Sequence, residues 1–304
     1  MSRTRYFAFG NVTIDDLVFA DGTTMWRVPG GNSIYAALGM AVWGERAEVV
    51  APIGRDYPVE KLNDRIELKR TRPIARTLRN WGLYEEDGTR HFVFRSGMRK
   101  WEEFSPNEAD LDEGPYAFCH LAPLPWALHL ELAAALRTKA ARLISVDLDD
   151  RRLAEVPASE IARLLGLIDL FMPSRQDVAE IFPGKTPLDA MKALRDMAPD
   201  TPVIVIKCGA AGAIAHERDA SDYLASPTAA AATVDETGAG DAFCGGALVG
   251  FSHNLALREA LARAAVSASF AVEAVGSSGL VAASPEEAEG RCRRVAERIE
   301  ARPL

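Results

Sequence analysis

The chain of 304 residues contains little cysteine, and its four cysteines stand alone, without the CxxC spacing of zinc sites or the density of a disulfide framework. No apolar stretch approaches membrane-spanning length, and the segment after Met1 has no apolar signal core. Long basic runs are also missing, and 43 acidic against 35 basic side chains leave a net charge of −8. We therefore expect a cytoplasmic protein that binds neither nucleic acid nor membranes.

The first expected strand is not followed by the glycine fingerprint of dinucleotide-binding enzymes. Such enzymes carry GxGxxG directly after the strand and an acidic residue about twenty positions later. Here the strand at 6–10 continues into Asn11, Val12 and Thr13. A dinucleotide-dependent oxidoreductase is therefore disfavoured, although it would share the fold class.

Strand-like apolar runs and helical segments alternate along most of the sequence. Strands are expected at 6–10, 47–53, 116–121, 143–146, 168–172, 203–207, 212–216 and 221–224. Helices are expected at 32–43, 126–139, 187–197, 241–250, 257–272 and 285–301. This order, with 48% apolar residues to fill a core, predicts an α/β fold with a mainly parallel central sheet flanked by helices.

Two segments interrupt this alternation, and both have the pattern of a hairpin. The first covers 16–28 with the turn signal Asp21-Gly22, and the second covers 77–95 with Asp87-Gly88. Together they would form a small antiparallel β-sheet over one edge of the main domain, where it would act as a lid. We expect a single domain over 1–304, with lid segments at about 11–28 and 73–98.

The stretch DETGAGDAF at 235–243 carries the clearest chemical signal. Gly238, Ala239 and Gly240 leave the backbone bare at the start of a helix, where free N–H groups and the helix dipole favour an anion. Asp241 lies in the first turn of that helix, where a base must stand to activate an attacking hydroxyl. Taken alone, these residues fit a helix cap after a glycine turn equally well.

A second glycine pair opens another helix near the amino terminus, within VPGGNSIYAAL at 28–38. The two motifs, about 200 residues apart and in this order, resemble the two signature regions of the PfkB, or ribokinase-like, family of carbohydrate kinases. Residues 235–241 match its DTxGAGD element with Glu236 in the second place, and residues 30–32 match its glycine pair. The resemblance spans nearly the whole chain, and it implies a ribokinase-like fold and an ATP-dependent kinase.

The resemblance also implies roles for individual residues. Asp241 would be the catalytic base, and the backbone of 238–240 would form the anion hole for the transferring phosphoryl group. Asp15 matches the family's sugar-binding aspartate, although the neighbouring Asp16 leaves the assignment open by one position. Further substrate contacts are implied for Gly30, Gly31 and Asn32.

Nucleotide contacts are implied in two further segments. IKCGAAGA at 206–213 matches the family's TxGxxG segment along the nucleotide, with Cys208 at or near the usual Thr, although a plain turn would also fit. The loop at 275–279 takes the place of one that borders adenine and, in many members, a monovalent cation. The implied nucleotide-binding residues are Lys207, Gly209, Gly212, Thr237 and Ser278.

Magnesium is implied together with ATP, but the residues expected to organise it depart from the family pattern. The family usually shows NxxE after the strand at 168–172, whereas this chain has Ser174 and Asp177 at those places. Asp177 keeps a carboxylate that would act through water. A capping box between Ser174 and Asp177 explains the same residues without a metal.

The substrate is expected to be a small sugar-like molecule. Basic lid residues suit a carboxylate or phosphate on it, although solvated strand faces are their commoner use. These residues are Arg79, Arg90, Arg95, Arg99 and Lys100. Tyr35 replaces an Asn frequent in the family and adds an aromatic surface, which keeps a nucleoside as the alternative. The leading hypothesis is a sugar or sugar acid, ahead of a nucleoside and of a relative that binds without catalysis; a homodimer through the lid is a further hypothesis.

Overall fold

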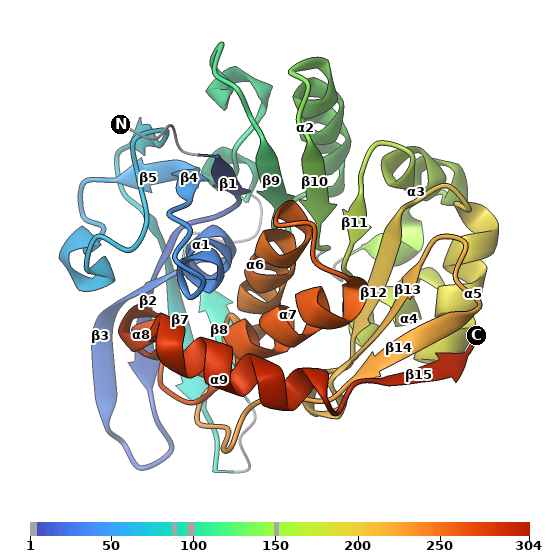
Figure 1. Cartoon of the computed structure of the whole chain (residues 1–304). Helices are drawn as coiled ribbons and strands as arrows, with labels where there is room; N and C mark the ends of the chain where they lie inside the picture. Colours follow the sequence, from blue (N-terminus) through green and yellow to red (C-terminus); the bar gives the residue numbers. More distant parts are fainter. Residues whose placement is uncertain (1–4, 87–89, 96–100, 149–151) are drawn as a thin grey trace.

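The computed structural model describes residues 5–86, 90–95, 101–148 and 152–304. A nine-stranded sheet crosses the molecule in the order β15-β14-β13-β12-β11-β10-β9-β1-β4 (Figure 1). Its strands are β1 (Tyr6–Phe9), β4 (Glu48–Val50), β9 (Phe118–Leu121), β10 (Leu143–Val146), β11 (Leu170–Phe171), β12 (Val203–Lys207), β13 (Ala213–Glu217), β14 (Asp222–Ser226) and β15 (Glu300–Pro303). Neighbours from β4 to β12 pair in parallel, and those from β12 to β15 pair antiparallel. The predicted mainly parallel sheet is confirmed.

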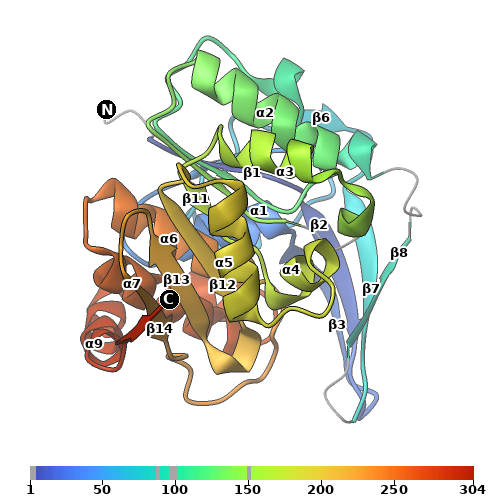
Figure 2. The ribbon, with the colours of Figure 1, turned by 90° about the vertical axis from the view of Figure 1, so that its right-hand side faces the viewer.

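Helices cover both faces of this sheet (Figures 1 and 2). One layer holds α1 (Asn32–Ala41), α6 (Ala239–Ser252), α7 (Leu257–Val272), α8 (Ser278–Ala282) and α9 (Pro285–Ala296), and the other holds α2 (Trp126–Thr138), α3 (Ala158–Leu165), α4 (Arg175–Ile181) and α5 (Pro187–Met197). Side chains alternate along each buried strand, so Tyr6 and Ala8 join the first layer while Phe7 and Phe9 join the second. The sheet therefore separates two hydrophobic cores.

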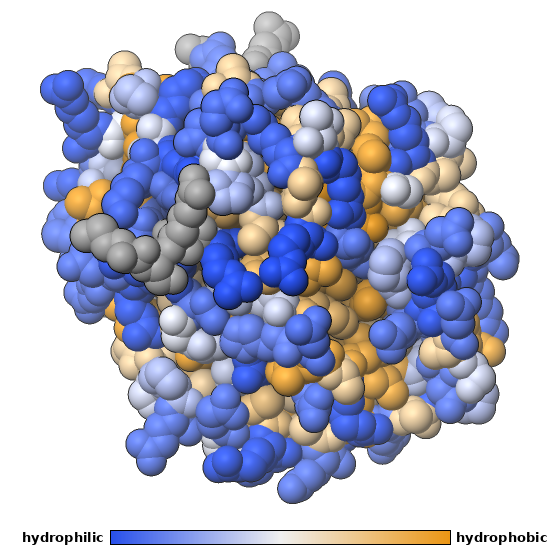
Figure 3. Space-filling model, turned by 45° about the horizontal axis from the view of Figure 1, so that its top comes forward, coloured by the Kyte–Doolittle hydropathy of each residue, from blue (hydrophilic) through white to orange (hydrophobic). Residues whose placement is uncertain are grey.

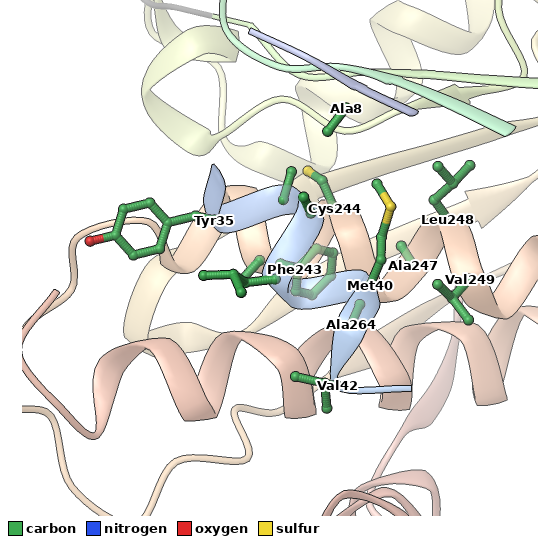
Figure 4. Close-up of a cluster of buried hydrophobic side chains, with 14 of the residues drawn as sticks. Ala8, Tyr35, Met40, Val42, Phe243, Cys244, Ala247, Leu248, Val249 and Ala264 are labelled. Carbon is green, nitrogen blue, oxygen red and sulfur yellow. The ribbon is translucent and has the colours of Figure 1, made fainter. Parts of the chain in front are cut away.

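Helices α1 and α6 pack with their backbones unusually close. A Cβ on Gly39 would lie 2.8 Å from the Ala242 Cα, and a Cβ on Gly245 would lie 3.0 Å from the Met40 N. Figure 4 shows Met40 and Cys244 in the buried cluster between these helices, with the Tyr35 ring directed away from its centre. The two helices that carry the glycine motifs thus lie side by side.

A four-stranded sheet of order β3-β2-β7-β8 stands beside the main sheet. It consists of β2 (Thr13–Val18), β3 (Thr24–Gly30), β7 (Leu78–Tyr84) and β8 (Arg90–Phe94). Both predicted hairpins are present, since β2–β3 and β7–β8 are antiparallel. The prediction of a wholly antiparallel sheet was wrong, because β2 and β7 pair in parallel. The first strands of the two hairpins, β2 and β7, are neighbours at the centre of the sheet, and the second strands, β3 and β8, form its edges. The action of this sheet as a lid stays a prediction.

Two predicted elements differ from the structure. The strand expected at 47–53 is divided, since β4 pairs with β1 whereas β5 (Pro52–Gly54) leaves to pair with β6 (Arg72–Ile74). The helix expected at 285–301 ends at Ala296, and the chain then forms β15 against β14. Both differences arise from pairing with strands remote in sequence, which a local pattern does not contain.

Hydrophilic residues cover most of the face shown in Figure 3, and apolar residues appear between them. Short 3-10 turns, η1 (Val59–Leu62), η3 (Glu102–Phe104), η4 (Glu108–Asp110), η5 (Leu153–Glu155) and η6 (Gly209–Ala211), complete the connections. Within the described residues, no helix is both long enough and apolar enough to cross a membrane.

Candidate active site

Helix α6 begins at a glycine whose conformation other residues adopt only with strain. Gly238 has a φ of 74°, and the ring of Tyr35 fills the space that a Cβ would need. The preceding loop is held by Asp235, whose carboxylate accepts hydrogen bonds from the Thr237 N and the Gly276 N, each at 2.9 Å. These contacts fix the direction in which the first N–H groups of α6 point.

Two cavities open on either side of this helix start. Ala239 and Gly240 line a cavity of about 500 Å³, and Gly238 and Asp241 line another of about 180 Å³. Within the described part of the chain, the Gly240 N–H has no hydrogen-bond acceptor, whereas that of Ala239 donates to the Glu236 O at 3.2 Å. An open N–H at a helix start is a site for an anion. The predicted cradle and base therefore lie between the larger and the smaller cavity.

Asp15 on β2 lines the smaller cavity together with Asp241. Its Oδ1 accepts a hydrogen bond from the Asn80 Nδ2 at 2.9 Å, because the β2–β7 register places these two residues opposite one another. Burial raises the pKa of Asp15 to about 7, although hydrogen bonds from Asn80 and Thr13 act to lower it. A buried carboxylate with spare acceptor capacity thus faces the cavity.

The neighbouring Asp16 serves a different purpose. Its Oδ2 lies 3.0 Å from the Arg95 Nη1 and 3.8 Å from the Arg79 Nη1, and its Oδ1 accepts the Arg27 N at 3.0 Å. Neither Arg79 nor Arg95 lines the smaller cavity, so these two residues do not support the expected contact with an anionic substrate. Of the other basic lid residues, Arg99, Lys100 and the side chain of Arg90 lie outside the described part.

The start of α1 forms another wall of the smaller cavity. Gly31 and Asn32 line it, whereas Gly30 lies behind Asp15, whose carboxylate occupies the place of a Cβ on that glycine. The Asn32 Nδ2 donates to the Pro123 O at 2.7 Å, and its Oδ1 accepts the Asn11 N at 2.7 Å. The Asn32 side chain therefore positions the two loops that meet at the cavity.

The remaining lining of the smaller cavity combines uncharged polar and aromatic side chains. The polar ones are Asn11, Thr13, Asn80 and Thr237, and the apolar and aromatic ones are Tyr35, Leu78, Phe92, Phe94 and Trp101. Among the described lining residues none is basic. This chemistry suits a neutral, hydroxylated ligand that also presents a flat or apolar face.

The larger cavity contains most of the residues predicted to contact a nucleotide. Lys207, Gly209 and Gly212 line it, together with the alanines of 229–232 and small residues of α7. Gly212 has a φ of 86°, which keeps the turn after β12 compact. The result is a mainly apolar slot that ends at the glycines of α6.

Lys207 lies where this slot meets α6. A Cβ placed on Gly240 would be 3.2 Å from the Lys207 Nζ, and the ammonium forms an ion pair with Asp147. Burial raises the pKa of Asp241 well above its usual range; Asp147 raises it further, and Lys207 opposes the rise. The cradle, the lysine and the two aspartates thus form one electrostatic unit.

Comparison with known proteins identifies the family. Residues 7–283 match the family described as pfkB family carbohydrate kinase. The chain belongs to this family. Family members are phosphotransferases that act on hydroxyl groups, so the predicted enzyme class, a phosphotransferase with an alcohol group as acceptor, is confirmed.

Individual known proteins match most of the chain, one in sequence and others in fold. The chain is 27% identical over 257 residues to a cytidine kinase of Thermococcus kodakarensis, a match covering 82% of this chain and 89% of the relative. A nucleoside kinase of Methanocaldococcus jannaschii superposes with a TM-score of 0.74 at 18% identity, covering 96% and 99% of the two chains. A ribokinase II of E. coli in complex with ATP and Mg²⁺ gives 0.78 at 17%, covering 96% and 100%. The predicted ribokinase-like fold is confirmed.

The departure of this pfkB chain from NxxE has a visible structural basis. The Ser174 N donates to the Asp177 Oδ2 at 2.6 Å, and the Asp177 N donates to the Ser174 Oγ at 3.1 Å. Ser174 lines the larger cavity, but Asp177 is buried and lines neither cavity. The capping-box interpretation therefore accounts for both residues, and magnesium contact through Asp177 stays a prediction.

Two other predicted nucleotide residues lie away from the larger cavity. Thr237 lines the smaller cavity instead. Ser278 is exposed at the start of α8, where its Oγ donates to the Val275 O at 2.7 Å, and it lines neither cavity. Their nucleotide contacts stay predictions.

The structure also brings in residues that the sequence reasoning missed. Asn80 reaches Asp15 through the parallel β2–β7 pairing, and Trp101 donates its Nε1 to the Asn11 Oδ1 at 2.8 Å. Asp147 follows β10 and pairs with Lys207. The only sequence signal for Asp147 is a carboxylate directly after a buried parallel strand, where such sheets place their sites.

Proposed function

We propose that this kinase transfers the γ-phosphoryl group of Mg·ATP to a hydroxyl of a nucleoside or free sugar, with the nucleoside as the favoured acceptor. One observation carries the proposal. Asp241, in the first turn of α6, lines the smaller cavity together with Gly238, whereas Ala239 and Gly240, which lie between them in the sequence, line the larger cavity. A base at this place can reach an acceptor hydroxyl while the adjacent N–H groups face the transferring group.

The protein's own residues divide the work as follows. Asp241 accepts the proton of the attacking hydroxyl, and its raised pKa makes it a stronger base than an ordinary carboxylate. The amides at the start of α6 hold the oxygens of the transferring group. Asp15 and Asn80 orient the acceptor through its other hydroxyls.

The larger cavity is the proposed ATP site. Its alanine-rich wall suits a purine ring, and its glycines allow phosphates to approach the backbone. No group of three or more His, Cys, Asp or Glu residues in the described part could hold a metal. Magnesium would therefore arrive with the phosphates and keep several waters, and it would neutralise phosphate charge. A monovalent cation beside 275–279 remains a prediction, which turnover in potassium against tetramethylammonium tests.

The lining of the smaller cavity favours a nucleoside over a sugar acid. Aromatic side chains from three separate segments suit a base, whereas no basic side chain among the described lining residues would meet a carboxylate. The cytidine kinase and nucleoside kinase relatives support the same class. A free sugar is the second candidate, because Asp15 and the amides of Asn11 and Asn80 suit hydroxyls alone.

The test is magnesium-dependent ADP release from ATP against a panel of nucleosides, free sugars and sugar acids. We expect turnover with a nucleoside, and a loss of about 10³-fold in Asp241→Asn with ATP binding retained. Turnover by Asp241→Asn close to that of the unchanged protein would refute the base assignment. Turnover of sugar acids alone would refute the acceptor class.

A homodimer through the four-stranded sheet is the proposed assembly. Large apolar side chains are exposed on it, namely Met25, Trp26, Leu83 and Val93, whereas Phe92, although also exposed, lines the smaller cavity. The Trp26 side chain lies against Trp81, with ring centroids 5.7 Å apart. Such a cluster on one sheet is typical of a surface that another chain covers.

A further inference from the structure

The ammonium of Lys207 is placed unusually for a structural lysine. It pairs with Asp147 inside the protein, where the exposed fraction of the Lys207 side chain is 11% and that of Asp147 is 4%. It also lines the larger cavity at the end nearest α6, close to the open N–H of Gly240. Among the described lining residues of that cavity, Lys207 is the only basic one.

We propose that the Lys207 ammonium binds the terminal phosphate of ATP and stabilises the phosphoryl group during transfer, and that Asp147 is the positioning residue that holds it there. This inference rests on the proposed kinase function and deepens it. The lysine is placed beside Gly240 and not along the alanine-rich wall, so its partner is the phosphate nearest α6.

The local charges explain why a cation is needed at this point. Asp147, Asp177 and Asp241 contribute three carboxyl groups, and Lys207 interacts electrostatically with all three and with the Cys244 thiol. An incoming phosphate adds further negative charge. Asp177 is engaged with Ser174 and lines neither cavity, so any contact of its carboxylate with a cation at the phosphate would run through water.

The transfer step then balances without another reactant. The acceptor oxygen forms a bond to the γ-phosphorus as the bond from that phosphorus to the β–γ bridging oxygen breaks. The hydroxyl proton passes to Asp241, and ADP leaves with the bridging oxygen. Lys207 keeps its proton throughout. Its ammonium has three N–H donors, so it can donate to Asp147 and to phosphate oxygens at the same time.

Nucleotide binding without metal tests the lysine without depending on turnover. Dissociation constants for ATP and ADP are measured in excess EDTA for the unchanged protein, for Lys207→Met and for the matched control Lys192→Met on the exposed face of α5. We expect Lys207→Met to lose about tenfold of the preference for ATP over ADP, while ADP affinity and the control stay within about twofold. An unchanged preference in Lys207→Met overturns the proposal.

A folding control accompanies this experiment. If Lys207→Met is unfolded by circular dichroism, the double variant Asp147→Asn/Lys207→Met takes its place, because it leaves no unpaired buried charge at this pair. The same loss of preference is expected. The binding result stands even if no acceptor on the panel is phosphorylated, so failure of the proposed function and failure of this inference are distinguishable.

The pH profile of kcat/KM tests the positioning role of Asp147. Asp147 raises the pKa of Asp241 and Lys207 lowers it, while Asp177 and Cys244 face the lysine from α4 and α6. Since the base must be deprotonated, Asp147→Asn should move the acid limb to lower pH, and Lys207→Met should move it to higher pH. If the two variants shift the acid limb in the same direction, or do not shift it, the proposed placement of Asp147 and Lys207 beside the base is overturned. A pair that only stabilised the fold would not move the acid limb in opposite directions.

Discussion

Replacing Asp15 by Asn should stabilise the protein and weaken acceptor binding together. Burial raises the pKa of Asp15 from 3.8 to about 7, so the ionised form is disfavoured in the folded state. A difference of about three pH units, at roughly 1.4 kcal/mol each, corresponds to about 4 kcal/mol in the free energy of unfolding. The amide of Asn carries no charge and can still accept the bond from Asn80.

The sign of the pH dependence follows from the raised pKa. Below pH 3.8 Asp15 is protonated in both states and costs nothing; between pH 3.8 and about 7 the folded protein holds a proton that the unfolded chain releases, so stability falls as pH rises. Above about pH 7 the cost is complete. Asp15→Asn should therefore gain roughly 2–3 kcal/mol more at pH 8 than at pH 5.

Urea unfolding at both pH values measures this gain, and acceptor titration measures binding. The matched control is Asp16→Asn, one position away, which removes the charge paired with Arg79 and Arg95 and should destabilise by about 1–3 kcal/mol. The reasoning is refuted if Asp15→Asn is no more stable at pH 8, or if its gain does not depend on pH. It is refuted for function if the acceptor KM stays unchanged, since we expect a rise of at least about tenfold.

Three further substitutions probe other parts of the site. Gly238→Ala should cost about 1–3 kcal/mol and lower kcat, because φ is 74° and the Tyr35 ring occupies the Cβ position; a thermal melt with single-turnover kinetics checks both, and a wild-type melt would contradict it. The double change Ser174→Asn/Asp177→Glu should lower the magnesium concentration for half-maximal rate, measured by titration, and an unchanged midpoint counts against a role for these positions. Trp26→Ser should convert a dimer to monomer in light scattering, because this side chain is 54% exposed; a monomeric unchanged protein would end the dimer proposal.

The sequence was sufficient where the signal was local. The α6 start was predicted because glycines, an acid and a helical pattern occur within nine residues, and α5 and α7 have the predicted bounds because their periodicity is strong. The choice between Asp15 and Asp16 needed the strand register, since one residue changes the face of the sheet. Asp147 and Asn80 stayed hidden because their partners are 60 and 65 positions away.

The close contact of α1 with α6 makes the proposed catalytic residues structurally independent of the sheet that carries the proposed acceptor-binding aspartate. The proposed base and the proposed anion cradle belong to α6, which packs tightly against α1 at Gly39 and Gly245, whereas Asp15 belongs to a different sheet. Displacement of that sheet would loosen the grip on the acceptor and leave the spacing of Asp241 from the cradle unaltered. Sequence drift in the small sheet can therefore retune which molecule is accepted while the phosphoryl-transfer geometry is inherited unchanged.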